Sequence, residues 1–298
     1  MSASVGSDRT SGVGAQPGLL TNLEIMTSLD LKELAARSEA AALFYTGFAD
    51  RQLVNAPGLQ ALRKWLLNQC GSSYMKHSLS SGLGHWSRQW EYPYILAQVA
   101  RHCSCHPASA ACDNACGDAA IAYLLASAGL DITGTDLNEQ LSTAWSHPDT
   151  ETLSGGMRFQ PADSHALPFD NARFDVSYCI SSLEHMRDPV QAINEMIRVT
   201  KPGGLVTFTM DVAPYESSVG QESNVNRINF QALQDVLASQ CSLFSAYRFA
   251  IPSDALSWQQ DCKTSSNLRD AAARRWRVLR GLPERPDFYI FGGSFIKR

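Results

Sequence analysis

The chain has 298 residues, of which 44% are hydrophobic, and this length suits one sizeable α/β domain with an additional segment. Its formal net charge of -4, without a basic block, gives no general footprint for nucleic acid. No uninterrupted apolar run approaches the roughly 18 residues that a membrane span needs, so we expect a cytoplasmic protein with a small-molecule partner and no membrane partner.

Residues 1–18 are rich in Ser and Gly and contain no apolar segment, which predicts a flexible tail and no signal peptide. The eight cysteines are interpreted as reduced thiols, as is usual in the cytoplasm. Cys103 and Cys105 lie between His102 and His106, which could suggest zinc. Their spacing differs from that of a paired Cys-x-x-Cys site, so we expect no metal.

Residues 19–106 are predicted to form a helical cap or lid. The expected helices cover residues 28–44, 57–67 and 86–103, and a Ser/Gly-rich connection covers 71–84. Ser28 can cap the first helix, and Pro57 can begin the second. The third stretch is dense in aromatic residues.

Strands and helices alternate in residues 107–298, which favours a mainly parallel sheet covered on both faces. Strands are expected near 109–113, 131–135, 157–161, 174–180, 204–211, 243–251 and 287–296. Helices are expected near 118–128, 188–199, 229–239 and 266–281. The last of these helices carries five arginines, for which we favour a solvated face over a phosphate site.

A turn of small residues, Asp113 to Ala119, connects the first of these strands to a helix, and Asp136 follows nineteen residues after Gly117. Small residues let backbone amides approach a ligand closely. A carboxylate at the end of the next strand can accept hydrogen bonds from two ribose hydroxyls. A glycine turn alone is often only a tight connection, so the pattern needs further motifs.

Three further motifs follow in order: a segment around Asp163, the triplet Leu183-Glu184-His185, and Lys201-Pro202-Gly203-Gly204. With them, residues 108 to about 212 resemble class I S-adenosylmethionine-dependent methyltransferases of the ubiquinone/menaquinone-biosynthesis type. The resemblance implies a Rossmann-like fold with a seven-stranded sheet of order 3-2-1-4-5-7-6. It also implies S-adenosylmethionine as the cofactor.

The resemblance places Asp113, Ala115 and Gly117 beside the methionine part of the cofactor, and Asn114 belongs to the same candidate loop. In the family pattern Asp-x-Gly-x-Gly-x-Gly, Ala115 and Ala119 replace the first and third glycines. A Cβ at a position with positive φ costs on the order of 1 kcal/mol. We therefore expect either a reshaped loop or a cofactor that sits differently.

The resemblance also supplies candidates for the nucleoside. Asp136 would hold the ribose hydroxyls, and Leu137 would pack on the adenine. Asp163 would accept a hydrogen bond from the adenine amino group, with Ser164 beside it. Cys179 completes the candidate cofactor-binding set.

S-adenosylmethionine carries a sulfonium, which an aromatic face can stabilise, and Tyr178 and the tryptophans of the N-terminal segment are the candidates for this role. His185 is a candidate general base, although anchoring of its loop is the more usual role of such a Glu-His pair and is slightly preferred. A related metal-binding pattern, Glu-x-x-Glu-His, would need a glutamate where Ser181 stands, which argues against a bound divalent ion.

Three functions are compatible with these motifs. The first is methyl transfer to an O, N or C atom of a small metabolite. The second is cyclisation of S-adenosylmethionine to azetidine-2-carboxylate with release of methylthioadenosine, for which Asn138 and Tyr178 would line a closed cage. The third is a non-catalytic S-adenosylmethionine-binding protein, which the retained carboxylates disfavour.

Overall fold

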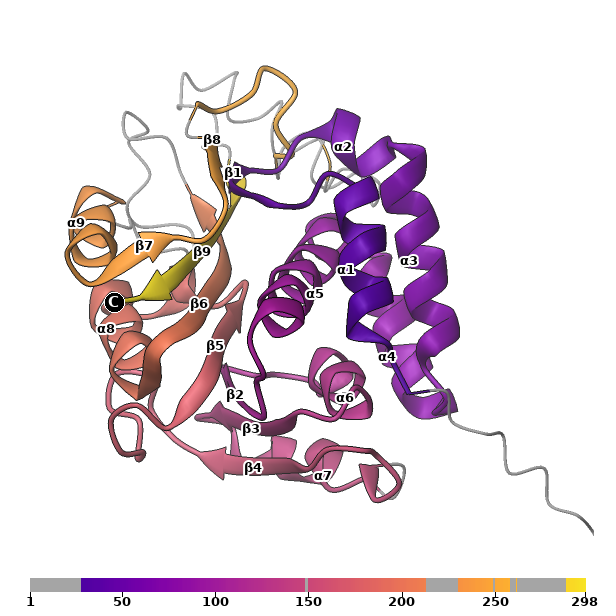
Figure 1. Cartoon of the computed structure of the whole chain (residues 1–298), viewed down its shortest axis with the longest axis vertical. Helices are drawn as coiled ribbons and strands as arrows, with labels where there is room; N and C mark the ends of the chain where they lie inside the picture. Colours follow the sequence, from indigo (N-terminus) through magenta and orange to yellow (C-terminus); the bar gives the residue numbers. More distant parts are fainter. Residues whose placement is uncertain (1–27, 148–149, 213–229, 249, 258–260, 262–287) are drawn as a thin grey trace, which may run out of the picture.

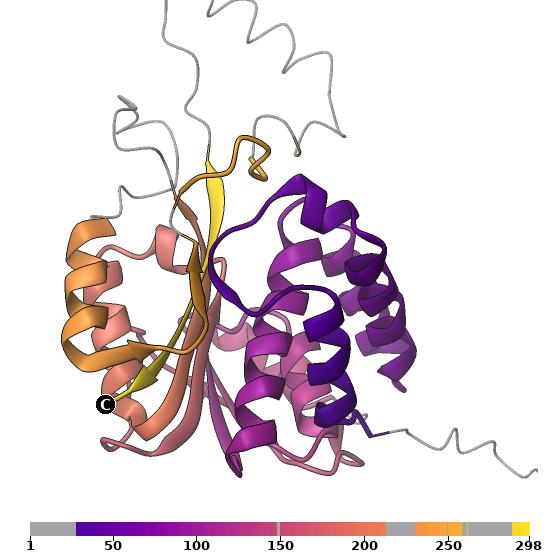
Figure 2. The same cartoon turned by 45° about the horizontal axis from the view of Figure 1, so that its top comes forward.

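The computed structural model describes residues 28–147, 150–212, 230–248, 250–257, 261 and 288–298. In this part of the chain a nine-stranded sheet lies between two layers of helices (Figure 1). Figure 2 shows the sheet nearly edge-on, with the N-terminal helices on one side and α8 and α9 on the other. None of the described helices is long and apolar enough to cross a membrane.

The sheet has the order β4-β3-β2-β5-β6-β9-β1-β8, and β7 also pairs with β9. In that order the strands span Met157–Pro161, Asp131–Asp136, Ala110–Asn114, Phe174–Ile180, Thr200–Val212, Tyr289–Lys297, Tyr45–Phe48 and Ala246–Arg248, and β7 spans Cys241–Leu243. Strands β2 to β6 are parallel to their neighbours among themselves, and β9 is antiparallel to β6.

The predicted order 3-2-1-4-5-7-6 is confirmed for β2 to β7 and β9, but the predicted count of seven strands is wrong. The strand expected at 243–251 is two short strands, because β7 pairs with β9 whereas β8 pairs with β1. Strand β1 was not predicted, and the first helix was expected to extend to residue 44. That helix ends earlier, at Ala40, and Ala42 turns the chain with a φ of 55°.

From residue 28 to residue 106 the structure describes five helices: α1 Leu31–Ala40, α2 Arg51–Asn55, α3 Pro57–Gln69, α4 Ser73–Leu83 and α5 Arg88–Cys105. Asp30, and not Ser28, caps α1 by accepting a hydrogen bond of 2.8 Å from the backbone N–H of Lys32. Pro57 begins α3 as predicted.

The connection expected at 71–84 is instead helix α4. Ser72 caps it by accepting a hydrogen bond of 3.1 Å from the backbone N–H of Met75. Met75, Leu79 and Leu83 recur every four residues and are buried, so packing of one apolar face outweighs the weak helix propensity of Ser and Gly.

The other helices of the described residues include α6 Ala120–Ser127, η1 Glu139–Leu141, α7 Ser142–Trp145, η3 Leu183–His185, α8 Pro189–Val199 and α9 Phe230–Gln240. They confirm the helices predicted near 118–128, 188–199 and 229–239. The arginine-rich helix predicted at 266–281 lies outside the described residues.

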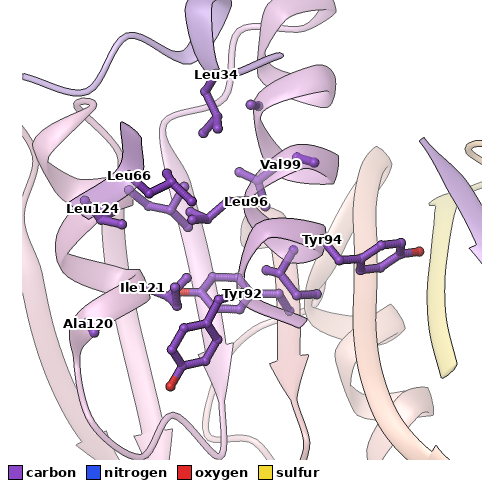
Figure 3. Close-up of a cluster of buried hydrophobic side chains, with 14 of the residues drawn as sticks. Leu34, Leu66, Tyr92, Tyr94, Leu96, Val99, Ala120, Ile121 and Leu124 are labelled. Atoms are coloured by element: carbon purple, nitrogen blue, oxygen red, sulfur yellow. The ribbon is translucent and has the colours of Figure 1, made fainter. Parts of the chain in front are cut away.

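One hydrophobic core joins the N-terminal helices to the sheet. Figure 3 shows Leu66, Leu96, Ile121 and Leu124 converging between α3, α5 and α6, and all four are buried. The core contains residues on both sides of the expected boundary at residue 106, and β1 pairs with β9. The described part of the expected cap is therefore packed as a continuous part of the fold. The N-terminal helices therefore pack against one face of the sheet (Figure 2).

Candidate functional site

Two neighbouring cavities open at the carboxyl ends of β2, β3 and β5. We call the cavity of about 130 Å³ the first chamber; it includes Arg88, Asp113 and Asp118 in its lining. The second chamber, of about 390 Å³, includes Asp136, Leu137, Asp163, Ser164 and His185. This edge of an open parallel sheet is where such folds place their ligands.

Ala115 and Ser182 line both chambers, so the two cavities meet at this pair. The Ser182 hydroxyl donates a hydrogen bond of 3.5 Å to the carbonyl oxygen of Ala115, which links the loop after β2 to the segment after β5. A ligand that fills both chambers must pass across this contact.

The first chamber combines one guanidinium with two carboxyl groups. Arg88 comes from the first turn of α5, Asp113 from the end of β2, and Asp118 from the following loop. Asp118 accepts a hydrogen bond of 2.7 Å from the Ser78 hydroxyl, which ties α4 to this loop. The chamber is therefore complementary to a zwitterion that carries both an ammonium and a carboxylate.

Asp113 is only 4% exposed. Burial raises the pKa of its carboxyl well above the usual value. The nearby Tyr178 hydroxyl lowers the same pKa, although the two groups make no hydrogen bond of normal geometry. A cationic ligand group beside Asp113 would favour the ionised carboxylate.

The loop between β2 and α6 is strained at one of the two expected alanines. Ala115 has a φ of 54°, and Gly117 has a φ of 50°. Ala119 has an ordinary φ of -84° and packs in the core at the start of α6, so the expected cost does not apply there. The Cys116 N–H donates to the carbonyl oxygen of Thr135 at 3.0 Å, which fixes the loop beside β3.

Asp136 stands at the junction of this loop and the second chamber. One of its carboxylate oxygens accepts from the Gly117 N–H at 3.3 Å, and the other accepts from the Asn138 N–H at 2.9 Å. Leu137, which follows it, is 75% exposed and offers an uncovered apolar face to the chamber. A carboxylate beside an exposed apolar side chain suits a ligand in which a sugar carries a flat ring.

Asp163 is held in place by the neighbouring His165. The Asp163 carboxylate accepts from the His165 backbone N–H at 2.9 Å and lies 2.5 Å from its Nδ1. Because His165 Nε2 accepts from the Asp188 N–H, its proton belongs on Nδ1, which donates to Asp163. The backbone and ring donors of His165 lower the pKa of Asp163.

The comparison with known families matches residues 112–208 to a family described as a methyltransferase domain. This segment runs from within β2 to within β6 and includes the carboxyl ends of β2, β3 and β5, where both chambers open. Residues 112–208 therefore belong to the methyltransferase domain family.

The methyltransferase domain is similar to ubiquinone biosynthesis O-methyltransferases. That of Coxiella burnetii (strain Dugway 5J108-111) is 34% identical over 98 residues, or 33% of this chain and 41% of that protein. That of Methylococcus capsulatus is 37% identical over 100 residues, or 33% of this chain and 42% of that protein. The chain thus spans about two fifths of the length of the relatives it matches.

Among solved structures, the [4+2]-cyclase SpnF has a TM-score of 0.49 and 17% identity, and the match covers 90% of this chain and 93% of that one. A geranyl diphosphate methyltransferase in complex with SAM has a TM-score of 0.48 and 14% identity, covering 86% and 98%.

The structure places four candidate residues of the methyltransferase domain outside both chambers. Tyr178 lies within β5 and is fully buried in the core between the sheet and the N-terminal helices. Asn114 and Cys179 are paired across β2 and β5 and are also buried, with Cys179 packed on the side of α8. Asn138 accepts a hydrogen bond from the Gln140 N–H and thereby caps η1.

The structure also adds residues that the sequence analysis missed. Arg88 and Tyr92 of α5 line the first chamber, and His165 and Arg187 line the second. A Cβ on Gly82 would lie 2.3 Å from the Tyr92 ring, so this glycine lets α4 pack closely behind that side chain. Nothing in the local sequence separates Arg88 from an ordinary solvated arginine at a helix start.

His185 lines the second chamber and is 52% exposed. Its Nε2 lies 3.9 Å from Oε1 of the fully buried Glu184. Within the described ranges, no three His, Cys, Asp or Glu residues are arranged to hold a metal ion.

Proposed function

We propose that this protein is an S-adenosylmethionine-dependent methyltransferase that acts on a small-molecule metabolite. The observation that supports this proposal most strongly is the pair of chambers that meet at Ala115 and Ser182. One chamber suits an amino-acid zwitterion and the other suits a nucleoside. S-adenosylmethionine consists of these two parts joined through a sulfonium.

In the first chamber, Arg88 would bind the donor's carboxylate, and Asp113 with Asp118 would bind its ammonium. These are charge-assisted interactions, which are stronger than neutral hydrogen bonds. The raised pKa of Asp113 falls when an ammonium takes the place of water beside it. Tyr92 forms an aromatic wall of the same chamber.

In the second chamber, Asp136 would accept hydrogen bonds from the ribose hydroxyls while its contacts to Gly117 and Asn138 keep it oriented. Leu137 would cover one face of the adenine. Asp163, positioned by His165, would accept from the adenine amino group. The sulfonium then belongs near Ala115 and Ser182, where the chambers meet.

The bound donor supplies an electrophilic methyl group. The chain's own residues need to align the acceptor with it, exclude water and remove one proton. His185 supplies an exposed imidazole to the second chamber, and Oε1 of the buried Glu184 lies 3.9 Å from its Nε2. We propose His185 as the residue that takes the acceptor's proton.

Two features support methyl transfer over the alternatives. The similarity to ubiquinone biosynthesis O-methyltransferases favours a hydroxyl as the acceptor group. Tyr178 and Asn138, which suggested a cage for cyclisation of S-adenosylmethionine, lie outside both chambers. Cyclisation and simple binding are therefore treated as outcomes of the test.

The experiment is incubation of the purified chain with S-adenosylmethionine, with and without a panel of hydroxylated aromatic acceptors, followed by mass spectrometry. Formation of S-adenosylhomocysteine together with a methylated acceptor is the expected result. Methylthioadenosine with azetidine-2-carboxylate from the donor alone would establish cyclisation instead. Saturable donor binding without any product over the panel would favour a binding protein.

A further inference from the structure

The two carboxylate oxygens of Asp163 have different partners. Oδ1 accepts from the His165 backbone N–H at 2.9 Å and from the His165 ring at 2.5 Å. Oδ2 accepts no hydrogen bond within the part of the chain that the structure describes, and the exposed Arg187 guanidinium lies 3.7 Å from it. Oδ2 is therefore available to a hydrogen-bond donor of a ligand in the second chamber.

The ring of His165 is fixed by the start of helix α8. Its Nε2 accepts from the N–H of Asp188, the residue that caps this helix, at 3.3 Å. The carbonyl oxygen of His165 accepts from the Gln191 side chain at 2.8 Å. Because Nε2 is an acceptor, the neutral imidazole carries its proton on Nδ1 and donates it to Asp163. One histidine thus connects a helix end to the carboxylate of the second chamber.

The surroundings of His165 leave its ring little freedom to turn. The residue is 9% exposed. The chain that follows it is also bound to α8, since the Leu167 N–H donates to Oε2 of Glu195 at 2.7 Å. A side chain held by packing and by such supporting hydrogen bonds keeps its partner in one geometry. Asp163 is therefore restrained through Oδ1.

A restrained Asp163 distinguishes purines by the group on carbon 6. A 6-amino group can donate to Oδ2, whereas a 6-keto oxygen would place two acceptors opposite each other. A 6-keto purine also carries an N1–H, which a carboxylate that is free to turn could accept instead. A carboxylate restrained through its other oxygen cannot turn in this way, so the 6-keto purine leaves it unpaired.

We propose that His165 is a positioning residue for the adenine of S-adenosylmethionine: its Nδ1–H holds Asp163 so that the second chamber accepts a 6-amino purine and rejects a 6-keto purine. The inference rests on the proposed function, because that function places the adenine beside Asp163. The Nδ1–H is already donated to Asp163, so His165 influences the choice of base through that carboxylate.

The test compares S-adenosylhomocysteine with S-inosylhomocysteine, in which a keto oxygen replaces the adenine amino group, as a ratio of dissociation constants from calorimetry. Two variants separate the two sides of the imidazole. In His165→Asn the amide nitrogen replaces Nδ1 and can still donate to Asp163, whereas in His165→Gln the amide replaces Nε2 and this bond is lost. We expect the wild type to prefer S-adenosylhomocysteine by about 100-fold, His165→Asn by a similar factor and His165→Gln by about tenfold or less.

The control is His77→Gln, because His77 is exposed on α4 and lines neither chamber, and its ratio should equal that of the wild type. Nitrogen NMR of the unaltered protein gives a second measurement, in which the ring proton of His165 should lie on Nδ1 with and without S-adenosylhomocysteine. Equal ratios for His165→Asn and His165→Gln, or a proton on Nε2, would overturn the inference. Failure of the wild type to bind either ligand would instead overturn the proposed function.

Discussion

Replacement of Arg88 by alanine is the change that bears most directly on the first chamber. Arg88 is half-buried at the start of α5, and its guanidinium lies 5.9 Å from the centre of the Tyr92 ring. It is the positive group among the first chamber's lining residues, where Asp113 and Asp118 supply the negative ones. The substitution leaves those carboxyl groups facing the donor's carboxylate without a cation.

The expected magnitude follows from the kind of interaction lost. A hydrogen bond between charged groups contributes about 1.5 to 3 kcal/mol, and partial exposure of Arg88 places it toward the lower end of that range. Donor affinity should therefore fall by roughly 10- to 100-fold, since about 1.4 kcal/mol corresponds to a factor of ten.

The assay is calorimetric titration with S-adenosylmethionine and with methylthioadenosine, which lacks the amino-acid part. Arg88→Ala should weaken binding of the first ligand and leave binding of the second nearly unchanged. Arg101→Ala is a matched control, because Arg101 lies on the same helix over the rings of Phe44 and Phe244, away from both chambers. Equal losses for both ligands would refute the assignment of Arg88 to the carboxylate.

Asp136→Ala should weaken S-adenosylmethionine binding by about 1 to 3 kcal/mol in calorimetry, and an unchanged affinity would remove the ribose assignment. Gly82→Ala brings a Cβ to 2.3 Å from the Tyr92 ring, so it should lower the free energy of unfolding in urea by about 1 to 3 kcal/mol and also weaken binding of S-adenosylmethionine. A wild-type free energy of unfolding together with wild-type affinity would contradict this packing. Tyr178→Ala should lower the unfolding free energy by about 3 to 5 kcal/mol with little loss of donor affinity, whereas a stable variant without turnover would restore a catalytic role. The pKa of Glu184, raised from 4.5 to about 8, means that the native state holds more protons than the unfolded state in that range, so wild-type stability falls there as pH rises. Glu184→Gln should therefore gain stability relative to the wild type between pH 5 and pH 8, and a constant difference in urea unfolding would argue against a protonated Glu184.

The placement of Asp136 and Asp163 at one edge of the sheet could be predicted from sequence because both residues follow strand ends directly. Asp136 and Asp163 come at or just after the ends of β3 and β4, and the carboxyl ends of parallel strands meet at one edge of the sheet. The same reasoning failed for Tyr178, which lies two residues before the end of β5. At that depth a side chain on this face packs in the core beneath the chamber.

The contribution of the N-terminal segment could not be predicted in the same way. Helix α4 consists largely of weak helix formers, and only tertiary burial of its Met75, Leu79 and Leu83 face identifies it. Arg88 reaches the first chamber because α5 packs across the sheet, a contact between residues distant in sequence. Strand β1 depends likewise on its partners β8 and β9.

A crystal structure of the complex with S-adenosylhomocysteine tests the central claim most directly. The account predicts adenosine over Leu137 with its ribose on Asp136, the amino-acid group beside Arg88 and Asp113, and the thioether sulfur at the contact of Ala115 with Ser182. A ligand that occupies only one chamber, or that lies elsewhere on the sheet, would contradict it.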